Sequence, residues 1–379
     1  MNRLASVAVV LVSVAGAVEA RSAWGQVSGS AGGGTTVAAP AAIPADARTS
    51  PAPEAFRPQI EAFVKGNLAR LKSGDGAAAA TARTALVSEV TGAATTSSYK
   101  DLFGATLASQ LGTLAGDPDA RVRLQAGVLA AKVAQASDNT QMSPVATKLL
   151  GDSNLGVVIW GLKTARGVLA FQASLPAGMS GSALPGAVAS AVAKVPESGE
   201  VVRDGYDALQ LDVTKLPGIR AATIQQLAPH VSAILASRSK IYLTKFPEFA
   251  DADRDAATFF SNFAFAGLPQ AEKTKVVQHL ADIVLLSALR GAEASGPQQK
   301  ALLDHAVNVG KNLYIIAQEI DKKSTPQTAA LLRSVQFFRN VGPITPPADD
   351  VISAAKATFA ALKTVPDYKG LVESALGSR

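Results

Sequence analysis

The chain has 379 residues, no cysteine, 48% hydrophobic residues and a formal net charge of +6. The hydrophobic content is ample for a large buried core, which excludes disorder over most of the length. Basic residues are interspersed with acidic ones instead of forming a stripe or patch, so the composition argues against a nucleic-acid partner.

The first 20 residues are predicted to be an export signal. Arg3 gives a positive start, residues 4–18 are apolar, and Ala20 is the small residue that a signal peptidase needs. The apolar stretch is shorter than the ~20 residues that cross a bilayer as a helix, although an uncleaved anchor is the alternative. We expect cleavage after Ala20 and a periplasmic or extracellular protein that is not transmembrane. The lack of cysteine excludes disulfides and a lipoprotein anchor.

Residues 21–54 are rich in Gly, Ser, Ala and Pro and are predicted to be a flexible tether. From residue 55 onward, apolar residues recur three and four positions apart between short Gly, Pro, Asp and Ser segments, and no alternating strand pattern is present. The chain is therefore predicted to be all-α. The expected helices lie at 56–72, 77–92, 98–115, 118–136, 141–150, 154–172, 183–195, 199–211, 217–228, 229–246, 252–266, 269–290, 297–322, 326–340, 347–364 and 367–377.

Three Gly-Asp pairs punctuate the first half, at Gly74-Asp75, Gly116-Asp117 and Gly151-Asp152. Glycine tolerates the left-handed conformation that ends a helix, and aspartate accepts hydrogen bonds from the free N–H groups that begin the next one. Each pair is therefore predicted to be a compact corner between helices. The spacings of 42 and 35 residues indicate repeated helical units.

The helices after these corners share a pattern of small and apolar residues at offsets 0, 4, 7 and 8, which lie on one helix face. An Ala or Gly in the middle of that face lets a neighbouring helix approach closely. The residues concerned are Val122, Ala126, Leu129 and Ala130; Val157, Gly161, Thr164 and Ala165; and, more faintly, Val201, Gly205, Ala208 and Leu209.

The segment DPDARVRLQAGVLAA at 117–131 resembles the repeats of the HEAT family, and the resemblance extends over about residues 111–211. It implies an α-solenoid in which Asp and Arg side chains form a ladder along the inner surface. Arg123 occupies the ladder position, but Val158 replaces Arg in the next unit and Arg203 is displaced by one residue. A non-repeating helical bundle is the alternative.

We therefore divide the chain into a signal at 1–20, a tether at 21–54, HEAT-like repeats at 55–212 and a helical C-terminal half at 213–379 that continues or caps the solenoid. The C-terminal half shows no period, and its longer helices make it irregular. Its residues 276–289 are apolar nearly all round, which predicts a central helix.

No motif predicts a catalytic, cofactor-binding or metal site. Ser237-Arg238-Ser239-Lys240, Ser137-Asp138-Asn139 and Lys72-Ser73-Gly74 resemble motifs of penicillin-recognising enzymes, but in reversed chain order. Residues 251–255 (DADRD) resemble a calcium loop, but Ala256 and Asn262 stand where Gly and Glu are needed. His230, His279 and His305 lack metal-ligand spacing. We expect no enzyme activity and no cofactor.

Six of the thirteen phenylalanines fall within residues 246–265. They predict either a hydrophobic junction between helices or an apolar groove for a lipid or partner helix.

The family resemblance implies a non-catalytic scaffold or protein-interaction module of the cell envelope, whose partner is another envelope protein or polymer. Two alternatives stay open: a binder of a small apolar ligand or lipid through residues 246–265, and an enzyme with an unrecognised site. The contact residues, the partner and the oligomeric state are not indicated by any motif.

Overall fold

The computed structural model describes residues 38–92, 94–137, 139–175, 178, 181–211 and 221–371. These residues form helices joined by short turns and contain no strand, which confirms the predicted all-α class. The predicted signal at 1–20 lies outside the described residues, as do residues 21–37 of the tether and 372–377 of the last predicted helix. The described start of that helix is a 3-10 turn at Pro366–Tyr368 instead of an α-helix.

The later part of the predicted tether is folded, which corrects its boundary at residue 54. Ala45–Thr49 forms the short helix α1, and Pro53–Phe56 forms a 3-10 turn. The side chains of Ile43 and Ala47 are buried in the core. Arg48 forms an ion pair with the buried Glu89 at 2.7 Å. Two apolar side chains and one ion pair thus hold a segment whose composition resembles a linker.

The helices begin and end within a few residues of the predicted positions over most of the chain. Their bounds are α2 Arg57–Lys72, α3 Gly76–Thr91, α4 Ser97–Leu114, α5 Ala120–Ala136, α6 Ser143–Leu150, α7 Leu155–Ser174, α8 Leu184–Lys194, α9 Gly199–Gln210, α10 Ala221–Tyr242, α11 Ala250–Phe259, α12 Gln270–Glu293, α13 Gly296–Asp321, α14 Pro326–Asn340 and α15 Ala348–Thr364.

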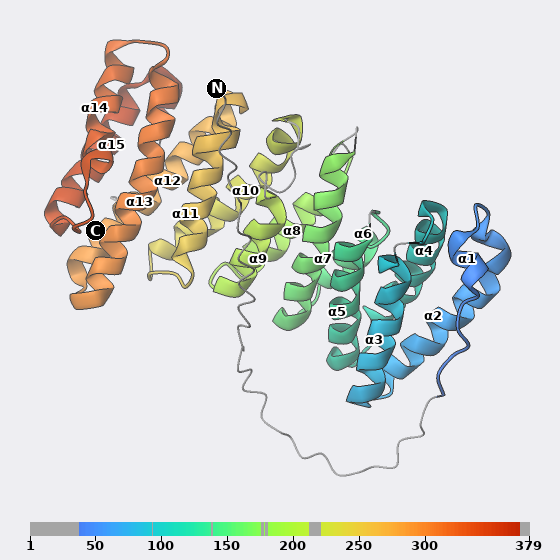
Figure 1. The fold of residues 1–379 in the computed structure, drawn as a ribbon. Coiled ribbons are helices and arrows are strands. Elements are labelled where there is room, and N and C mark those ends of the chain that lie inside the picture. The colour runs from blue at the N-terminus through green and yellow to red at the C-terminus, as the bar shows by residue number, and fades with distance from the viewer. Residues whose placement is uncertain are drawn as a thin grey trace, which may run out of the picture. The chain divides into compact units, whose positions relative to one another are not determined.

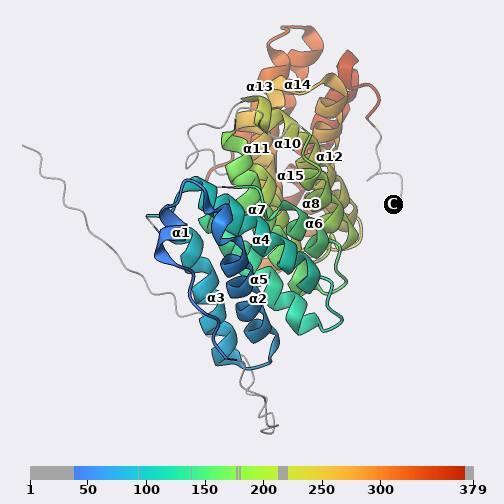
Figure 2. The ribbon, with the colours of Figure 1, turned by 90° about the vertical axis from the view of Figure 1, so that its right-hand side faces the viewer.

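From α2 to α11, each helix packs against the second helix after it in the chain. Helices α2, α4, α6, α8, α10 and α12 follow one another in one row, and α3, α5, α7, α9, α11 and α13 follow one another in a second row. Successive helices also pack across the two rows, as in α2 with α3 and α12 with α13. Figure 1 shows the helices succeeding one another in chain order, and Figure 2 views them from the side of α1 and α2.

The last two helices exchange rows. Helix α14 packs beside α13, and α15 packs beside α12 and α14. Because α14 packs on α13, the alternation between the two rows changes there, although α15 also contacts α13. The row that contains α12 is completed by α15 instead.

Two predicted boundaries in the middle of the chain differ from the structure. Helix α10 runs through Pro229 without a break, whereas Pro229 was predicted to begin a new helix. Leu227, Val231 and Ile234 on either side are all buried, so continuous packing outweighs the one backbone hydrogen bond that proline removes. The predicted division at 212/213 falls within residues 212–220, outside the described part, and packing of α8 on α10 and α9 on α11 spans it.

The predicted stacking face is buried in all three helices, since its described side chains are each at most 2% exposed. Two glycines of α7 show why small residues are needed. A Cβ at Gly161 would lie 3.0 Å from the backbone nitrogen of Leu150 in α6, and a Cβ at Gly167 would lie 2.8 Å from the carbonyl group of Ala134 in α5. Backbones this close leave no room for a larger residue.

Ion pairs join the three predicted corners. Lys72 Nζ lies 2.6 Å from Asp117 Oδ2, which connects the first corner to the second. Arg123 donates to both carboxylate oxygens of Asp152, at 2.6 and 3.1 Å, and to the carbonyl oxygens of Asp117 and Pro118. The second and third corners are therefore linked through one guanidinium group.

The local geometry of the corners was only partly predicted. Gly74 has a φ of +88° and Asp75 caps α3, as expected. Asp119, and not Asp117, caps α5, and Asn154, and not Asp152, caps α7. Asp117 accepts from the N–H group of Asp119 at 3.0 Å, and Asp152 accepts from that of Asn154 at 2.8 Å. Both aspartates therefore stabilise the turn that precedes the cap. Gly151 keeps a right-handed backbone.

Candidate functional site

Phe249 is displayed at the start of α11 in a conformation that costs energy. Its φ of 52° and ψ of 42° place it in the left-handed region, which a bulky residue rarely adopts. Its side chain is 43% exposed. Residues with strained backbone conformations cluster at functional sites, so Phe249 is a candidate binding residue.

The ring of Phe249 rests on the N-terminus of α9. A Cβ at Gly199 would lie 2.2 Å from a ring carbon of Phe249, so only glycine permits this contact. The guanidinium of Arg203, one turn further along α9, lies over the ring at 5.7 Å from its centroid. Gly199 and Arg203 thus fix the position of the exposed ring.

Phe249 borders a hollow of about 200 Å³ between α7 and α9. Leu155, which is 42% exposed, and Ile159 follow each other on one face of α7 at a spacing of four residues. We define the Phe249 surface as the residues that line this hollow together with Leu155. Its members are Leu155, Ile159, Lys163, Glu200, Arg203, Asp204 and Phe249.

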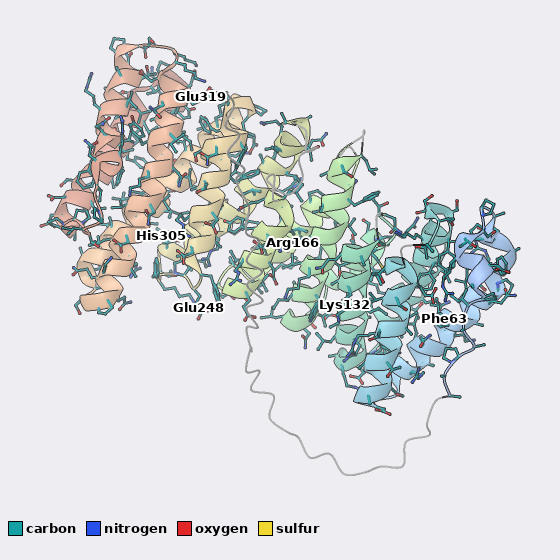
Figure 3. All side chains as sticks on the ribbon, in the orientation of Figure 1. Phe63, Lys132, Arg166, Glu248, His305 and Glu319 are labelled. Atoms are coloured by element: carbon teal, nitrogen blue, oxygen red, sulfur yellow. The ribbon has the colours of Figure 1, made fainter. Side chains whose placement is uncertain are left out.

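Two ion pairs join α7 and α9, one within the Phe249 surface and one next to it. Lys163 Nζ lies 3.7 Å from Asp204 Oδ2, and Arg166 lies 3.3 Å from Asp207 one turn further along both helices. Burial raises the pKa of Asp204, and the positive charge of Lys163 counteracts this effect. Figure 3 labels Arg166 on α7 and Glu248, the residue before Phe249. The surface combines an aromatic ring and an arginine, which are enriched in protein interfaces, with two aliphatic side chains.

The sequence pointed to this surface only in part. Phe249 belongs to the predicted Phe-rich stretch, and Arg203 was noted for being out of register with the repeat. Their contact requires the chain to bring α9 beside the start of α11, which no local pattern indicates. The left-handed conformation of Phe249 has no sequence signal either, because neither glycine nor asparagine stands there.

Most of the Phe-rich stretch forms a junction, in agreement with one of the two predictions. Phe259, Phe260 and Phe265 are buried, whereas Phe263 is 46% exposed. A π-helical turn at Phe260–Ala264 follows α11. Phe259 and Phe260, at the point where α11 gives way to this turn, are both buried, with ring centroids 5.5 Å apart.

A group of hydrogen-bonded polar side chains, which we call the Arg238 cluster, lies inside the core among α9, α10, α11 and α13. The Arg238–Asp253 pair is fully buried, with Arg238 donating to both carboxylate oxygens. Tyr206 and Tyr242 also donate to Asp253, at 3.1 and 2.9 Å. Arg238 donates further to the carbonyl oxygens of Pro196 and Glu248, so the cluster also fixes the residue next to Phe249.

The buried charges of this cluster satisfy one another. Burial alone would lower the pKa of Arg238, but the carboxylate of Asp253 outweighs that effect and raises it. Because the Tyr242 hydroxyl donates to Asp253, it accepts from Nε2 of His305, which lies 2.9 Å away and stacks on the Tyr242 ring. Figure 3 labels His305 on α13. Every member is committed to the fold, which makes this a structural cluster.

The burial of His305 leads us to expect that the protein loses stability in acid. Its burial, with Arg254 and Arg238 nearby, lowers its pKa to about 3 from an ordinary value near 6.5. Between pH 3 and pH 6.5 the unfolded chain therefore binds a proton at His305 that the folded chain does not bind. The contribution of His305 to the free energy of unfolding is fully present above pH 6.5 and is lost as the pH falls below that value. We expect His305 to remove about 2 kcal/mol between pH 7 and pH 5.

This expectation is checked by urea denaturation at several pH values, in which the slope of the unfolding free energy is compared with that of His305→Gln. The variant should show a flatter slope between pH 7 and 5. The slope that remains in the variant comes in part from His279, whose pKa is lowered to about 4 chiefly by burial. An identical slope in wild type and variant would refute the assignment.

The motifs rejected from the sequence are not assembled in space. Lys72-Ser73-Gly74 ends α2, whereas Ser237 to Lys240 lies within α10, and Figure 1 shows these helices well apart. Asp138 of the remaining motif lies outside the described residues. The acidic run at 251–255 begins α11, where Asp253 turns inward to Arg238. Within the described part of the chain, no group of three or more His, Asp or Glu residues is placed to hold a metal ion.

Comparison with protein-family models finds no matching family, and comparison with curated proteins finds no matching sequence. Among the helices of the described residues, none combines the length and the apolar composition that spanning a membrane requires.

Proposed function

We propose that this chain is an exported, non-catalytic helical-repeat protein that binds another envelope protein through the Phe249 surface. The observation that carries the proposal is the exposed Phe249 ring, held in a strained backbone conformation beside Arg203. The strain costs of order 1–3 kcal/mol, which a fold retains where the displayed group is needed.

We further propose that the two rows of helices form a HEAT-like α-solenoid. Packing between every second helix from α2 to α13 supports this arrangement, as do the ion pairs that join the three corners. In this interpretation α14 and α15 are the cap, because the last pair reverses its order within the rows. A cap of this kind closes the open end of a helical stack.

The chemistry of the Phe249 surface favours a protein partner. An exposed arginine–aromatic pair with aliphatic neighbours and the Lys163–Asp204 ion pair beside it combines residue types that are enriched in protein interfaces. The charged and aromatic groups of the Arg238 cluster are enclosed in the core and fully hydrogen-bonded, which supports a structural role for them. The pattern of residues 1–20 supports export.

The proposal is tested by capture of the partner from chemically crosslinked envelopes. Wild type, Phe249→Ser and Phe263→Ser are expressed with the same tag and purified. Phe263 is the matched control, since it is an exposed phenylalanine of the same stretch outside the Phe249 surface. We expect one protein to be recovered in near-equal amount with wild type and Phe263→Ser, and at least about tenfold less with Phe249→Ser, because central aromatic residues of an interface contribute 2 kcal/mol or more.

Circular dichroism of the three purified proteins establishes that each is folded. If folded Phe249→Ser recovers the same protein in the same amount as wild type, the Phe249 surface is not the binding site. If no protein is recovered with wild type either, the proposed scaffold role is wrong.

A further inference from the structure

A cavity of about 760 Å³ lies between α10 and α12. Its wall from α10 includes Ala236, Lys240 and Leu243, which recur at spacings of four and three and so form one stripe of the helix. Leu371, which follows α15 in the chain, closes another side. A cavity of this size is within the range of small-molecule sites.

The α12 wall of the cavity has a polar and an apolar part. Lys275, His279, Asp282 and Leu286 recur every three or four residues along one face of α12 and span about 16 Å of helix. The apolar side chains of the cavity are Ala236, Leu243, Leu286 and Leu371. The cavity therefore offers hydrocarbon contacts along its length and a cluster of hydrogen-bonding groups at one region.

The charges at this cluster favour an anion. Lys240 forms no ion pair with an acidic side chain among the described residues, and Lys275 shares its charge with Glu272 at 2.7 Å. Lys240, Lys275 and His279 line the same cavity. Burial lowers the pKa of His279 to about 4, and the charges of Lys240 and Lys275 add to this effect while Glu272 opposes it. Nδ1 of His279 is buried and makes no hydrogen bond with any described residue.

One acidic group also faces the cavity. Asp282 lies one turn beyond His279 on α12, and its Oδ2 accepts from Gln278 at 2.9 Å. An anionic group in the cavity is therefore placed at the Lys240 and Lys275 side of His279, away from Asp282. The neutral imidazole can donate one hydrogen bond from Nδ1 at that position.

We propose that the α10–α12 cavity binds a long-chain fatty acid or a carboxylate of the same class. The hydrocarbon chain packs against the four apolar side chains, and the carboxylate pairs with Lys240 and Lys275 and accepts from His279. This site is separate from the Phe249 surface, so it does not depend on the proposed protein partner. It also differs from the Phe-rich groove predicted from the sequence, because no phenylalanine lines it.

The proposal is tested by isothermal titration of the delipidated, full chain with three probes. Palmitate carries both the chain and the charge, hexadecanol carries the chain alone, and acetate carries the charge alone. We expect saturable binding of one palmitate, weaker binding of hexadecanol and no binding of acetate. Absence of saturable palmitate binding overturns the proposal, and equal affinity for hexadecanol overturns the role of the charge.

Two substitutions locate the site. Lys240→Glu is expected to weaken palmitate binding at least about tenfold, since a charge-assisted hydrogen bond is replaced by repulsion. Lys245→Glu is the matched control, because Lys245 is exposed nearby in the chain but does not line the cavity. Leu243→Asp, at a side chain that is 38% exposed and so tolerant of change, should abolish binding. Equal affinities of the Lys240→Glu and Lys245→Glu variants for palmitate would show that palmitate binds elsewhere.

Discussion

Replacing Arg238 with methionine is expected to lower the free energy of unfolding by about 3–5 kcal/mol. The substitution leaves the carboxylate of Asp253 buried among apolar groups with only two tyrosine hydroxyls to compensate it. It also removes the donors to the partly buried carbonyl oxygens of Pro196 and Glu248. The loss is measured by urea denaturation at pH 7.

A double variant separates the contribution of the Arg238–Asp253 ion pair to stability from the penalty of leaving one buried charge unpaired. Arg238→Met with Asp253→Leu should be more stable than either the Arg238→Met or the Asp253→Leu single variant, because no buried charge remains. Arg254→Met is the control, since Arg254 is 40% exposed and pairs only with exposed acids; its loss should stay within about 1 kcal/mol. A loss of this small size in Arg238→Met would contradict the assigned role of the cluster.

Two identical substitutions at different glycines are expected to change stability in opposite directions. Gly167→Ala should lower the free energy of unfolding by about 1–3 kcal/mol, because the new Cβ would meet the backbone of Ala134 at 2.8 Å and force α5 and α7 apart. Gly112→Ala, in α4, should raise it by about 0.5–1 kcal/mol, because nothing lies within 4 Å of the new Cβ and alanine favours the helix.

Thermal and urea denaturation of both alanine variants checks this expectation. Gly112→Ala controls for the general effect of replacing glycine in a helix. If Gly167→Ala is as stable as Gly112→Ala, the two helices are not in the close contact that the structure shows.

The positions of the helices were predictable because they depend on local patterns. Apolar spacing, a cap such as Asp75 and the small residues at Gly161 and Gly205 are all properties of short segments. The choice between Asp117 and Asp119 as the cap of α5 could not be predicted, because both residues are aspartate and the geometry of the turn decides which one caps the helix. The prediction that Pro229 begins a new helix was wrong, because the packing that keeps α10 continuous through Pro229 comes from other helices.

The polar clusters could not be predicted because their members come from distant parts of the sequence. Arg238 stood in a motif that was dismissed, and Asp253 stood in an apparent calcium loop; only the fold brings them together with Tyr206 and His305. Phe249 and Arg203 are likewise joined by the packing of α9 near α11. The HEAT-like solenoid, export and the scaffold role stay predictions.

The claim on which this account depends is that the chain acts by binding a protein at the Phe249 surface, and site-specific photo-crosslinking in intact cells tests it most directly. A photoreactive phenylalanine analogue is placed at position 249 or, in a matched variant, at position 263, where the native side chain is similarly exposed. We expect one discrete crosslinked protein from position 249 and none from position 263. No crosslinked species from position 249, or the same species from both positions, would contradict the account.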